Sequence, residues 1–322
     1  MYWQVLPWGG VRTYPRGMDD HRAEISDFLR TRRARISPEQ AQLFAYGGHR
    51  RVPGLRREEV AMLAGVSVDY YARLERGNLS GVSDEVLGAI GRALQLDEAE
   101  SAHLFDLARA ARGSARPRRA PQRTQRVRPS VQRLLDAWTA PAWVRNDRMD
   151  LLATNQLGAA LYAPILESPL QPPNNARFAF LDPRATEFYV DWEQGANDLV
   201  AILRSNAGRN PEDRALRELI GELSTKSEVF RSRWANHNVR FHRTGLKRLR
   251  HPVVGDLELD YEAFELPADP GLTMFAYTSQ PGSPTEERLK LLSSWAASEA
   301  AAAAATEAEV TDAAIRTHDV ER

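Results

Sequence analysis

One segment, residues 57–77, combines side chains that could contact nucleic acid with the spacing of two short helices. It reads REEVAMLAGVSVDYYARLERG. The outward positions of its second helix are predicted to be Val68, Asp69, Tyr70, Ala72, Arg73 and Arg76. A face that meets only water would be more uniformly polar, whereas arginine, aspartate and valine offer donors, acceptors and methyl groups to base edges. The chemistry that this face offers is therefore contact with a DNA groove.

The residues between these side chains build the turn that would position them. The first helix is expected over residues 57–64, with Val60 and either Leu63 or Ala64 directed inward at helical spacing. Ala61 is small enough for the second helix to cross closely, Gly65 allows the chain to turn sharply after the first helix, and Val66 fills the corner between the helices. Ser67 is the expected N-cap of the second helix, and Tyr71 and Leu74 are its inward residues. An ordinary helical hairpin would explain the apolar positions, but not the glycine turn, the capping serine and Gly77 at the exit together. The pattern predicts a helix-turn-helix.

Three further helices are predicted around this motif. They span residues 23–33, 84–96 and 97–111 and bring the N-terminal domain, residues 18–111, to five helices. The connection at residues 34–56 is unusually long for a compact domain, and it contains Arg50 and Arg51. We predict that these two arginines contact DNA phosphates; a solvated charge run is the alternative.

Charge is distributed unevenly along the 322 residues. The formal net charge is zero, but residues 1–128 hold 22 arginines and no lysine against 15 acidic residues, so they carry +7 and the remainder −7. A basic half suits a polyanion. Residues 112–128 hold seven of the arginines together with prolines, and they are predicted to be a basic linker that could add sequence-independent affinity for DNA.

Several absences narrow the class of protein. There is no cysteine, which excludes disulfides and thiolate metal sites and favours an intracellular, cytoplasmic protein, and no apolar run reaches the roughly 18 residues of a membrane span. Residues 1–17 lack the apolar core of a signal peptide, so we expect an unstructured extension, with translation starting at Met18. No nucleophile elbow, phosphate loop or dinucleotide glycine motif occurs, and the spacing of His237, His242 and His251 matches no standard zinc arrangement. We therefore expect neither catalytic residues nor a metal.

The second half of the chain, residues 129–295, mixes helix and strand patterns. Helices are predicted over residues 129–137, 156–162, 182–205, 211–224 and 227–235, and strands over residues 142–146, 151–155, 245–251, 257–265 and 273–278. This pattern supports an α+β domain. The alanine-rich tail, residues 296–322, favours helix by propensity, but its polar flanks predict a frayed or disordered end.

Both halves resemble a known family of bacterial regulators. Residues 25–111 resemble the phage-repressor-type (Cro-like) helix-turn-helix domain, and the run VPGLRREEVAMLAGVSVDYYARLERG resembles its MmyB-like subgroup. Four segments resemble the PAS-like ligand-binding domain of that subgroup: RPSVQRLLDAW, APAWVRNDRMDLLATN, LDPRATEFYVDWE and KRLRHPVVGDLELDYEAF. The resemblance implies a multidomain transcriptional regulator, in which an all-α five-helix domain is followed by an α+β PAS-like domain.

The resemblance also implies roles for individual residues of the motif. The positions that read base edges in that family are Val68, Asp69 and Arg73 in this chain. Arg73 would donate two hydrogen bonds to guanine and Val68 would meet a thymine methyl group, while Asp69 would either accept from cytosine or cap the helix. The residues placed to hold phosphates are Arg56, Arg57, Ser67, Tyr70, Arg76 and Asn78. Glu75 is expected to form an ion pair inside the domain, with an arginine of the motif's first helix.

Partners follow from the size of the domain and from the resemblance. One such domain reads only a few base pairs of double-stranded DNA, so we expect a homodimer on a palindromic operator. For the second domain the resemblance implies a small apolar effector such as a fatty acid. The residues predicted to bind it are Trp192, Trp234, His237 and Arg240. The alternative is that the second domain binds no small molecule and serves only dimerisation or assembly.

Overall fold

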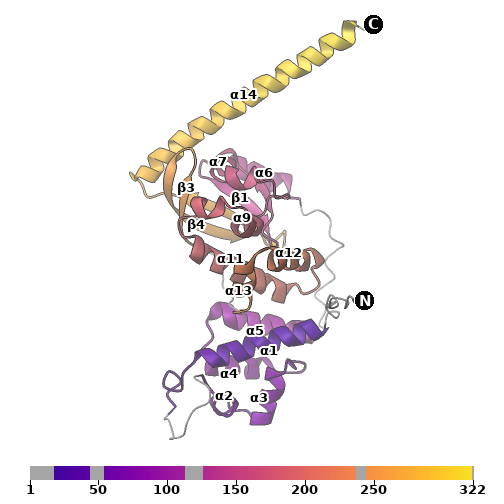
Figure 1. The fold of residues 1–322 in the computed structure, drawn as a ribbon, viewed down its shortest axis with the longest axis vertical. Helices are drawn as coiled ribbons and strands as arrows, with labels where there is room; N and C mark the ends of the chain where they lie inside the picture. The colour runs from indigo at the N-terminus through magenta and orange to yellow at the C-terminus, as the bar shows by residue number, and fades with distance from the viewer. Residues whose placement is uncertain (1–17, 44–53, 113–125, 237–243, 321–322) are drawn as a thin grey trace, which may run out of the picture. The chain divides into compact units, whose positions relative to one another are not determined.

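The structure is a computed structural model that describes residues 18–43, 54–112, 126–236 and 244–320. The chain divides into two compact units, an N-terminal unit and a C-terminal unit, and each is described by itself (Figure 1). No described helix combines the length and the hydropathy that a membrane crossing requires. Predictions about residues 1–17, Arg50, Arg51, His237 and Arg240 fall outside the described residues.

The N-terminal unit consists of five helices, as predicted. They are α1 (Met18–Arg35), α2 (Arg57–Ala64), α3 (Val68–Glu75), α4 (Asp84–Ala93) and α5 (Glu98–Ala111). Each of the five helices contributes fully buried residues: Ile25, Phe28 and Leu29 of α1, Val60 of α2, Tyr71 and Leu74 of α3, Leu87 of α4, and Leu107 of α5. Since these positions recur at helical spacing, the apolar pattern of the sequence is what folds the unit.

The long connection between the first two helices is shorter and better anchored than predicted. α1 continues to Arg35, two residues beyond its predicted end. Leu55 is buried, and its backbone N–H donates to the carbonyl oxygen of Arg33 at 3.1 Å. The chain that leads into α2 is therefore fastened to the end of α1.

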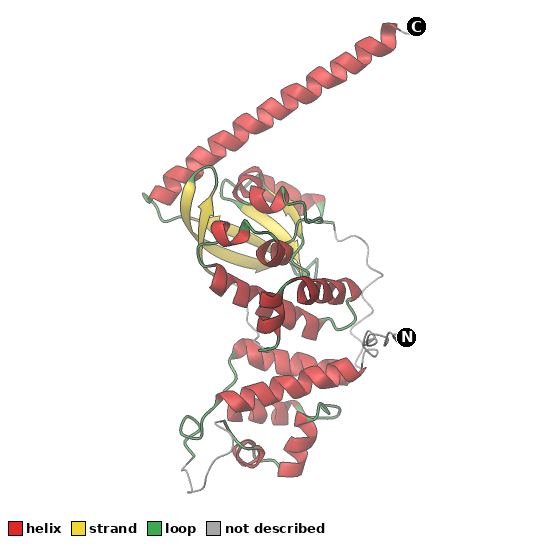
Figure 2. Cartoon of the chain, viewed as in Figure 1, coloured by secondary structure: helices red, strands yellow, loops and turns green. Residues whose placement is uncertain are grey.

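The C-terminal unit is built on one antiparallel sheet of five strands, drawn in yellow in Figure 2. The strands are β1 (Ala142–Asn146), β2 (Leu151–Thr154), β3 (Thr244–His251), β4 (Gly255–Glu265) and β5 (Leu272–Thr278), in the order β2-β1-β5-β4-β3. β1 lies beside β5, with Trp143 opposite Phe275. The hairpin of β1 and β2 is therefore part of the same sheet as strands that follow about a hundred residues later. The α+β class is confirmed.

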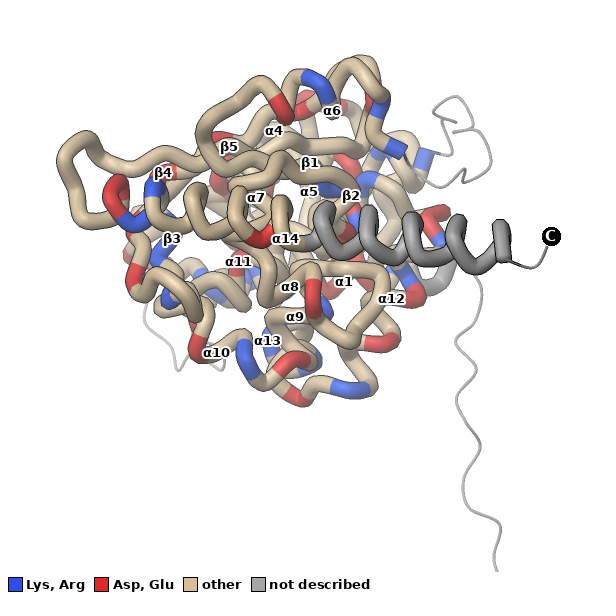
Figure 3. The backbone as a smooth tube through the Cα atoms, turned by 90° about the horizontal axis from the view of Figure 1, so that it is seen from above, with Lys and Arg blue, Asp and Glu red and all other residues tan. Residues whose placement is uncertain are grey.

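The helices of this unit are grouped before, between and after the strands. They are α6 (Pro129–Asp136), α7 (Gln156–Leu161), α8 (Ala163–Leu166), α9 (Asn175–Leu181), α10 (Ala185–Phe188), α11 (Trp192–Arg209), α12 (Arg214–Lys226), α13 (Glu228–Trp234) and α14 (Pro284–Val320). Figure 3 shows both basic and acidic positions along the described residues of the unit; in the sheet, β3 carries the basic residues and its neighbour β4 the acidic ones.

The single helix predicted over residues 182–205 is wrong, because these residues form α10 and most of α11, with a break between Phe188 and Trp192. At the break Tyr189 is extended and bridges to Leu249, and the backbone N–H of Val190 donates to the carbonyl oxygen of Arg248 at 3.2 Å, so the segment pairs with β3 instead of continuing the helix. Before α10, Asp182 is followed by proline and avoids the helical conformation. Its carboxylate accepts hydrogen bonds from the guanidinium and the backbone N–H of Arg184, each at 3.0 Å, and these bonds hold the pKa of Asp182 down at about 2.

The prediction of a frayed or disordered tail is also wrong, since α14 is one helix from Pro284 to Val320. Its start, which the sequence analysis missed, has Pro284 in its first turn, and the Ser283 hydroxyl accepts from the backbone N–H of Glu286 at 3.2 Å. The helix lies against α7 and β4 and buries Leu289 and Leu292 in the core. Packing at its start therefore anchors a helix whose later turns rest on alanine propensity.

We predict that Leu292→Ala destabilises the C-terminal unit by about 2 to 5 kcal/mol, because it removes fully buried methyl groups beneath α14. Leu291→Ala is the matched control: its side chain is 65 % exposed, so the same deletion should cost less than about 0.5 kcal/mol. Urea unfolding of the full chain measures both. Equal losses would contradict the packing of α14 described here.

Candidate functional site

The turn between α2 and α3 has the geometry that the sequence predicts. Gly65 ends α2 with φ of 66°, a left-handed conformation that residues with a Cβ rarely adopt. The backbone N–H of Val66 then donates to the carbonyl oxygen of Ala61 at 3.0 Å. Ser67 caps α3, because its hydroxyl accepts from the backbone N–H of Tyr70 at 3.1 Å. The helix-turn-helix and its N-cap are confirmed.

The burial of the motif's residues decides whether Leu63 or Ala64 faces inward. Val60, Ala61 and Ala64 are buried, whereas Leu63 is 39 % exposed, so Ala64 and not Leu63 packs inward. Val66 at the corner is only half-buried. Gly77 follows α3 with φ of 86°, and a Cβ at this position would collide with the carbonyl oxygen of Arg22 in α1. Small residues at Ala61, Ala64 and Gly77 thus let the motif pack closely.

A buried carboxylate fixes the end of α3. Glu75 is only 2 % exposed, and its two oxygens accept from two arginines: Arg33 of α1 at 2.7 Å, and Arg57 of α2. Arg33 also donates to the carbonyl oxygen of Leu55 at 2.7 Å. The ion pair expected between Glu75 and an arginine of the motif's first helix is confirmed by Arg57. Arg33 is the residue that sequence reasoning missed.

Arg57, predicted to hold a DNA phosphate, is paired with Glu75 inside the domain. Its Nε is occupied by Glu75, and this hydrogen bond and the carboxylate charge raise the pKa of the Arg57 guanidinium. Because 53 % of the side chain stays exposed, its other N–H groups still face solvent. Arg57 therefore positions α3 first, and a phosphate contact would use the remaining donors.

The outward face of α3 is open. Val68 is 42 % exposed, Asp69 and Arg73 are exposed, and the Arg73 guanidinium carbon lies 4.8 Å from the centre of the Tyr70 ring. This cation–π contact orients a long side chain that would otherwise sample many rotamers. Since Ser67 provides the side-chain cap, the carboxylate of Asp69 is available to a partner outside the domain. The three predicted base-reading residues therefore lie together on one surface.

The predicted phosphate-binding residues surround this face. Arg56, Ser67, Arg76 and Asn78 are exposed, and Tyr70 is half-buried beneath Arg73. The backbone N–H of Arg56 donates to the Glu59 carboxylate at 2.6 Å, which leaves the Arg56 guanidinium at the N-terminus of α2. Polar and cationic groups are thus placed at both ends of the motif, where the strands of a duplex would pass.

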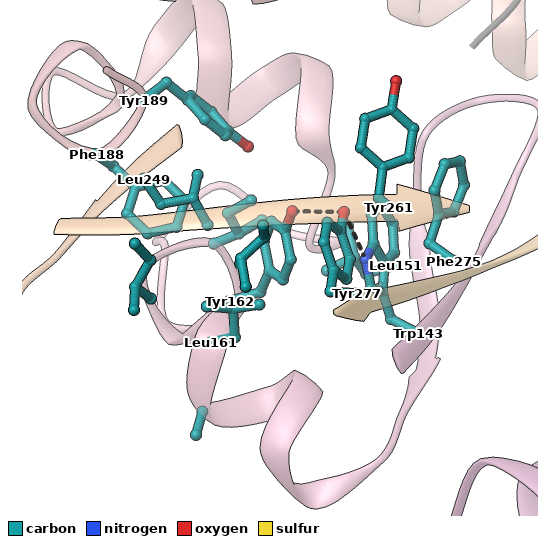
Figure 4. Packing of buried hydrophobic residues seen from close by; sticks show 14 of the residues in the cluster. Trp143, Leu151, Leu161, Tyr162, Phe188, Tyr189, Leu249, Tyr261, Phe275 and Tyr277 are labelled. Carbon is teal, nitrogen blue, oxygen red and sulfur yellow. Dashed lines mark hydrogen bonds between the residues drawn. The ribbon is translucent and has the colours of Figure 1, made fainter. Parts of the chain in front are cut away.

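The C-terminal unit contains a buried aromatic cluster on its sheet. Figure 4 shows a chain of hydrogen bonds within it: the Tyr162 hydroxyl donates to that of Tyr277 at 2.7 Å, and Trp143 Nε1 donates to the same oxygen at 3.2 Å. Burial raises the pKa of Tyr277 to about 12 and those of Tyr162 and Tyr189 further above the ordinary value. These phenols are therefore neutral at physiological pH.

Beside this cluster lies a small cavity of about 30 Å³. Its polar lining consists of Arg145 of β1, Asn175 of α9, Asp198 of α11 and Lys247 of β3, and Leu199 and Ile202 contribute apolar walls. Lys247 lies with its ammonium nitrogen 4.5 Å from the centre of the Tyr189 ring. Burial of this ammonium, opposed in part by Asp198 and Asp191, lowers the pKa of Lys247 to about 8.

The residues predicted to bind an effector do not line this cavity. Trp192 donates from Nε1 to the carbonyl oxygen of Ala179 at 2.9 Å, and Trp234 stacks on Phe230 with ring centres 5.5 Å apart. Both indoles make packing contacts, and their predicted role in effector binding stays a prediction. His237 and Arg240 lie outside the described residues. The sequence gives only a weak indication that Lys247 lines a cavity. It is one of few lysines in the chain, and it lies in a predicted strand.

Of the three histidines considered for a metal site, His251 lies in the described residues, and its role is structural. His251 is buried, and its Nε2 is hydrogen-bonded to the carbonyl oxygen of Ala160 at 3.0 Å. Burial lowers the pKa of this imidazole. Over the described ranges, no three acidic or histidine side chains gather closely enough to hold a metal ion.

These two units define a class of protein, a DNA-binding helix-turn-helix regulator with a ligand-binding type of second domain. Comparison with known families specifies it further: residues 24–104 match the model of a helix-turn-helix domain, and residues 127–292, about half of the chain, match that of the MmyB-like transcription regulator ligand binding domain. The chain belongs to the MmyB-like transcription regulators. A search of the curated proteins finds no match to this chain.

We predict that Glu75→Gln destabilises the N-terminal unit by about 3 to 5 kcal/mol, because it leaves the Arg33 guanidinium buried without its counter-charge. Arg33→Ala should cost more than Arg57→Ala, since the second arginine is half exposed. Thermal unfolding followed by circular dichroism gives the three losses. A Glu75→Gln variant as stable as wild type would contradict this account of how α3 is held.

We predict that Arg73→Ala relaxes the preference at one base pair of each half-site, at a cost of about 1 to 3 kcal/mol. Arg109→Ala, an exposed arginine paired with Asp106 on α5, is the matched control and should leave the preference unchanged. Binding to a library of single-base operator variants measures the effect. Uniform weakening on every sequence would instead identify Arg73 as a phosphate contact.

We predict that Lys247→Met stabilises the C-terminal unit at pH 7, on the order of 1 kcal/mol after allowance for solvent screening. The folded pKa of about 8 lies below the ordinary 10.5, so the folded chain holds the charged lysine at a cost below pH 8, and this cost disappears as the pH rises toward 10.5. The advantage of the variant should shrink over that interval. Lys290→Met, at an exposed position, should show no such gain, and a constant difference at all pH values would contradict the assignment.

Proposed function

We propose that this protein is a sequence-specific transcriptional regulator that binds a palindromic operator as a homodimer and responds to a small molecule in its C-terminal unit. The observation that carries the DNA-binding part is the outward face of α3: Val68, Asp69 and Arg73 are exposed together, on a helix that Glu75 and Ser67 hold at its two ends. A fixed helix with an unfilled polar face suits a major groove.

Dimerisation is supported by the length of α3. A helix of 8 residues is about 12 Å long, so it reaches only a few base pairs. Two copies on half-sites one helical turn apart would double the number of bases read and match a two-fold operator. Exposed apolar side chains on the C-terminal unit, Leu134 of α6 and Leu291 and Trp295 of α14, are available to such an assembly.

The effector is proposed to be an apolar acid such as a fatty acid. The family match to a ligand binding domain and the aromatic and aliphatic walls of the cavity support this part. At about 30 Å³ the cavity has room for a head group and not for an alkyl chain, so a chain would have to displace side chains such as Leu199 and Ile202. Such a displacement is a route by which binding could change the protein's affinity for DNA.

The small cavity also favours a second candidate, in which the C-terminal unit serves only assembly. The two functions are separated by one experiment on the full chain. Randomised duplexes are selected for binding, the stoichiometry on the selected duplex is measured by analytical ultracentrifugation, and operator affinity is then measured with and without decanoate.

We expect a selected sequence with two-fold symmetry, two chains per duplex, and an operator affinity that decanoate changes at least fivefold, a coupling of about 1 kcal/mol. A single chain on an asymmetric site would contradict the dimer. Unchanged affinity and an unchanged melting temperature at saturating decanoate would favour the assembly function.

A further inference from the structure

A groove of about 130 Å³ lies between α4 and α5 in the N-terminal unit, and the DNA-binding face of α3 does not use it. Its apolar walls and its floor are formed by Leu87, Gly88, Gly91, Leu96, Leu104 and Phe105. Phe105 is half-buried, and its ring contacts no other aromatic ring of the described residues. Apolar cavities of about 150 Å³ accept benzene, so this groove has room for one six-membered ring and not for a long alkyl chain.

The two glycines of the floor are required neither by the backbone nor by packing. Gly88 and Gly91 lie in the interior of α4, and neither has a positive φ. A Cβ at Gly91 would lie 3.7 Å from the Ser101 hydroxyl oxygen, and a Cβ at Gly88 would lie 3.5 Å from a guanidinium nitrogen of Arg92; both are ordinary contact distances. Glycine weakens a helix interior relative to alanine. The structural effect of these two glycines is therefore an open groove floor.

The charge of the lining indicates the kind of group that would occupy one end of the groove. Among the described residues that line it, Arg92 is charged and the others are neutral. Because its guanidinium lies over Gly88, this side chain borders the groove instead of extending into solvent. It forms no hydrogen bond and no ion pair with the part of the chain that the structure describes. By contrast, the Gln95 amide already donates to the carbonyl oxygen of Gln40 at 3.0 Å.

We propose that this groove binds a small aromatic carboxylate, with the ring on Gly88 and Gly91 beside Phe105 and the carboxylate on the Arg92 guanidinium. A guanidinium fork donates to both oxygens of a carboxylate, and the Phe105 ring offers an aromatic contact to the ligand's ring. The site is separate from the cavity of the C-terminal unit and does not depend on the effector proposed for that unit. Since α4 packs against α2, a ligand here adjoins a helix that supports the DNA-binding motif.

The test compares three small molecules on the full wild-type chain: benzoate, benzamide and acetate. Benzoate carries both the ring and the charge, benzamide has the same size without the charge, and acetate has the charge without the ring. Dissociation constants follow from the rise in melting temperature with concentration, at an ionic strength held constant with sodium chloride. We expect benzoate to bind at least fivefold more tightly than either of the other two.

Two variants with matched controls assign the binding to this groove. Arg92→Met should weaken benzoate binding at least fivefold, whereas Arg30→Met, at an exposed arginine of α1, should leave it unchanged. Gly91→Ala places a methyl group in the groove and should weaken binding at least threefold without lowering the melting temperature of the free protein. Gly221→Ala, in α12 with open space around the added Cβ, is its control and should leave binding unchanged.

The proposal is overturned if benzoate does not bind, if benzamide or acetate binds as tightly, or if either Arg92→Met or Gly91→Ala keeps the wild-type affinity. Loss of benzoate binding in Lys247→Met with full binding in Arg92→Met would place the ligand in the C-terminal cavity and would also overturn it. So would a change of oligomeric state in Gly91→Ala without benzoate binding to the wild type, because the groove would then be an interface between copies of the chain. The three-molecule comparison uses the wild-type chain, so it decides the proposal even if a variant fails to fold.

Discussion

The carboxylate of Glu75 is the interaction on which the DNA-binding unit depends. It stands at the last residue of α3 and is shared by Arg33 of α1 and Arg57 of α2, so one buried group joins three helices. A pair of this kind is costly to bury, and removing one partner is costlier than keeping it. The main effect of this ion pair is therefore on geometry. It fixes the orientation of α3 relative to α1 and α2, while Ser67 fixes where the helix begins.

In the C-terminal unit the organising constraint is the burial of polar groups beside aromatic rings. Trp143, Tyr162 and Tyr277 satisfy one another by hydrogen bonds and form a rigid wall. Lys247 lies against the Tyr189 ring with Asp198 in the same cavity lining, and burial still lowers its pKa. Stable cores seldom retain such a group unless it serves a purpose, and sites of this kind are candidates for ligand recognition.

Much of this arrangement was predictable from local patterns. The strand at residues 142–146 and the turn at Gly65 have the predicted bounds, because they depend on nearby alternation and on backbone conformation. What failed depended on contacts distant in sequence or on capping. The helix break after Phe188 involves a bridge from Tyr189 to Leu249 of β3, and the partnership of Arg33 with Glu75 joins residues 42 positions apart. The predicted ligand residues stay a prediction, since aromatic side chains in a single sequence do not distinguish a core from a cavity.

The central claim is that α3 reads DNA through one exposed face. A crystal structure of the full chain with a duplex selected from random sequence tests it most directly. The account predicts α3 in the major groove, with the Arg73 guanidinium within hydrogen-bonding distance of a base edge and Glu75 still held by its two arginines. A complex in which α3 faces away from the duplex, or in which Arg73 contacts only phosphates, would contradict it.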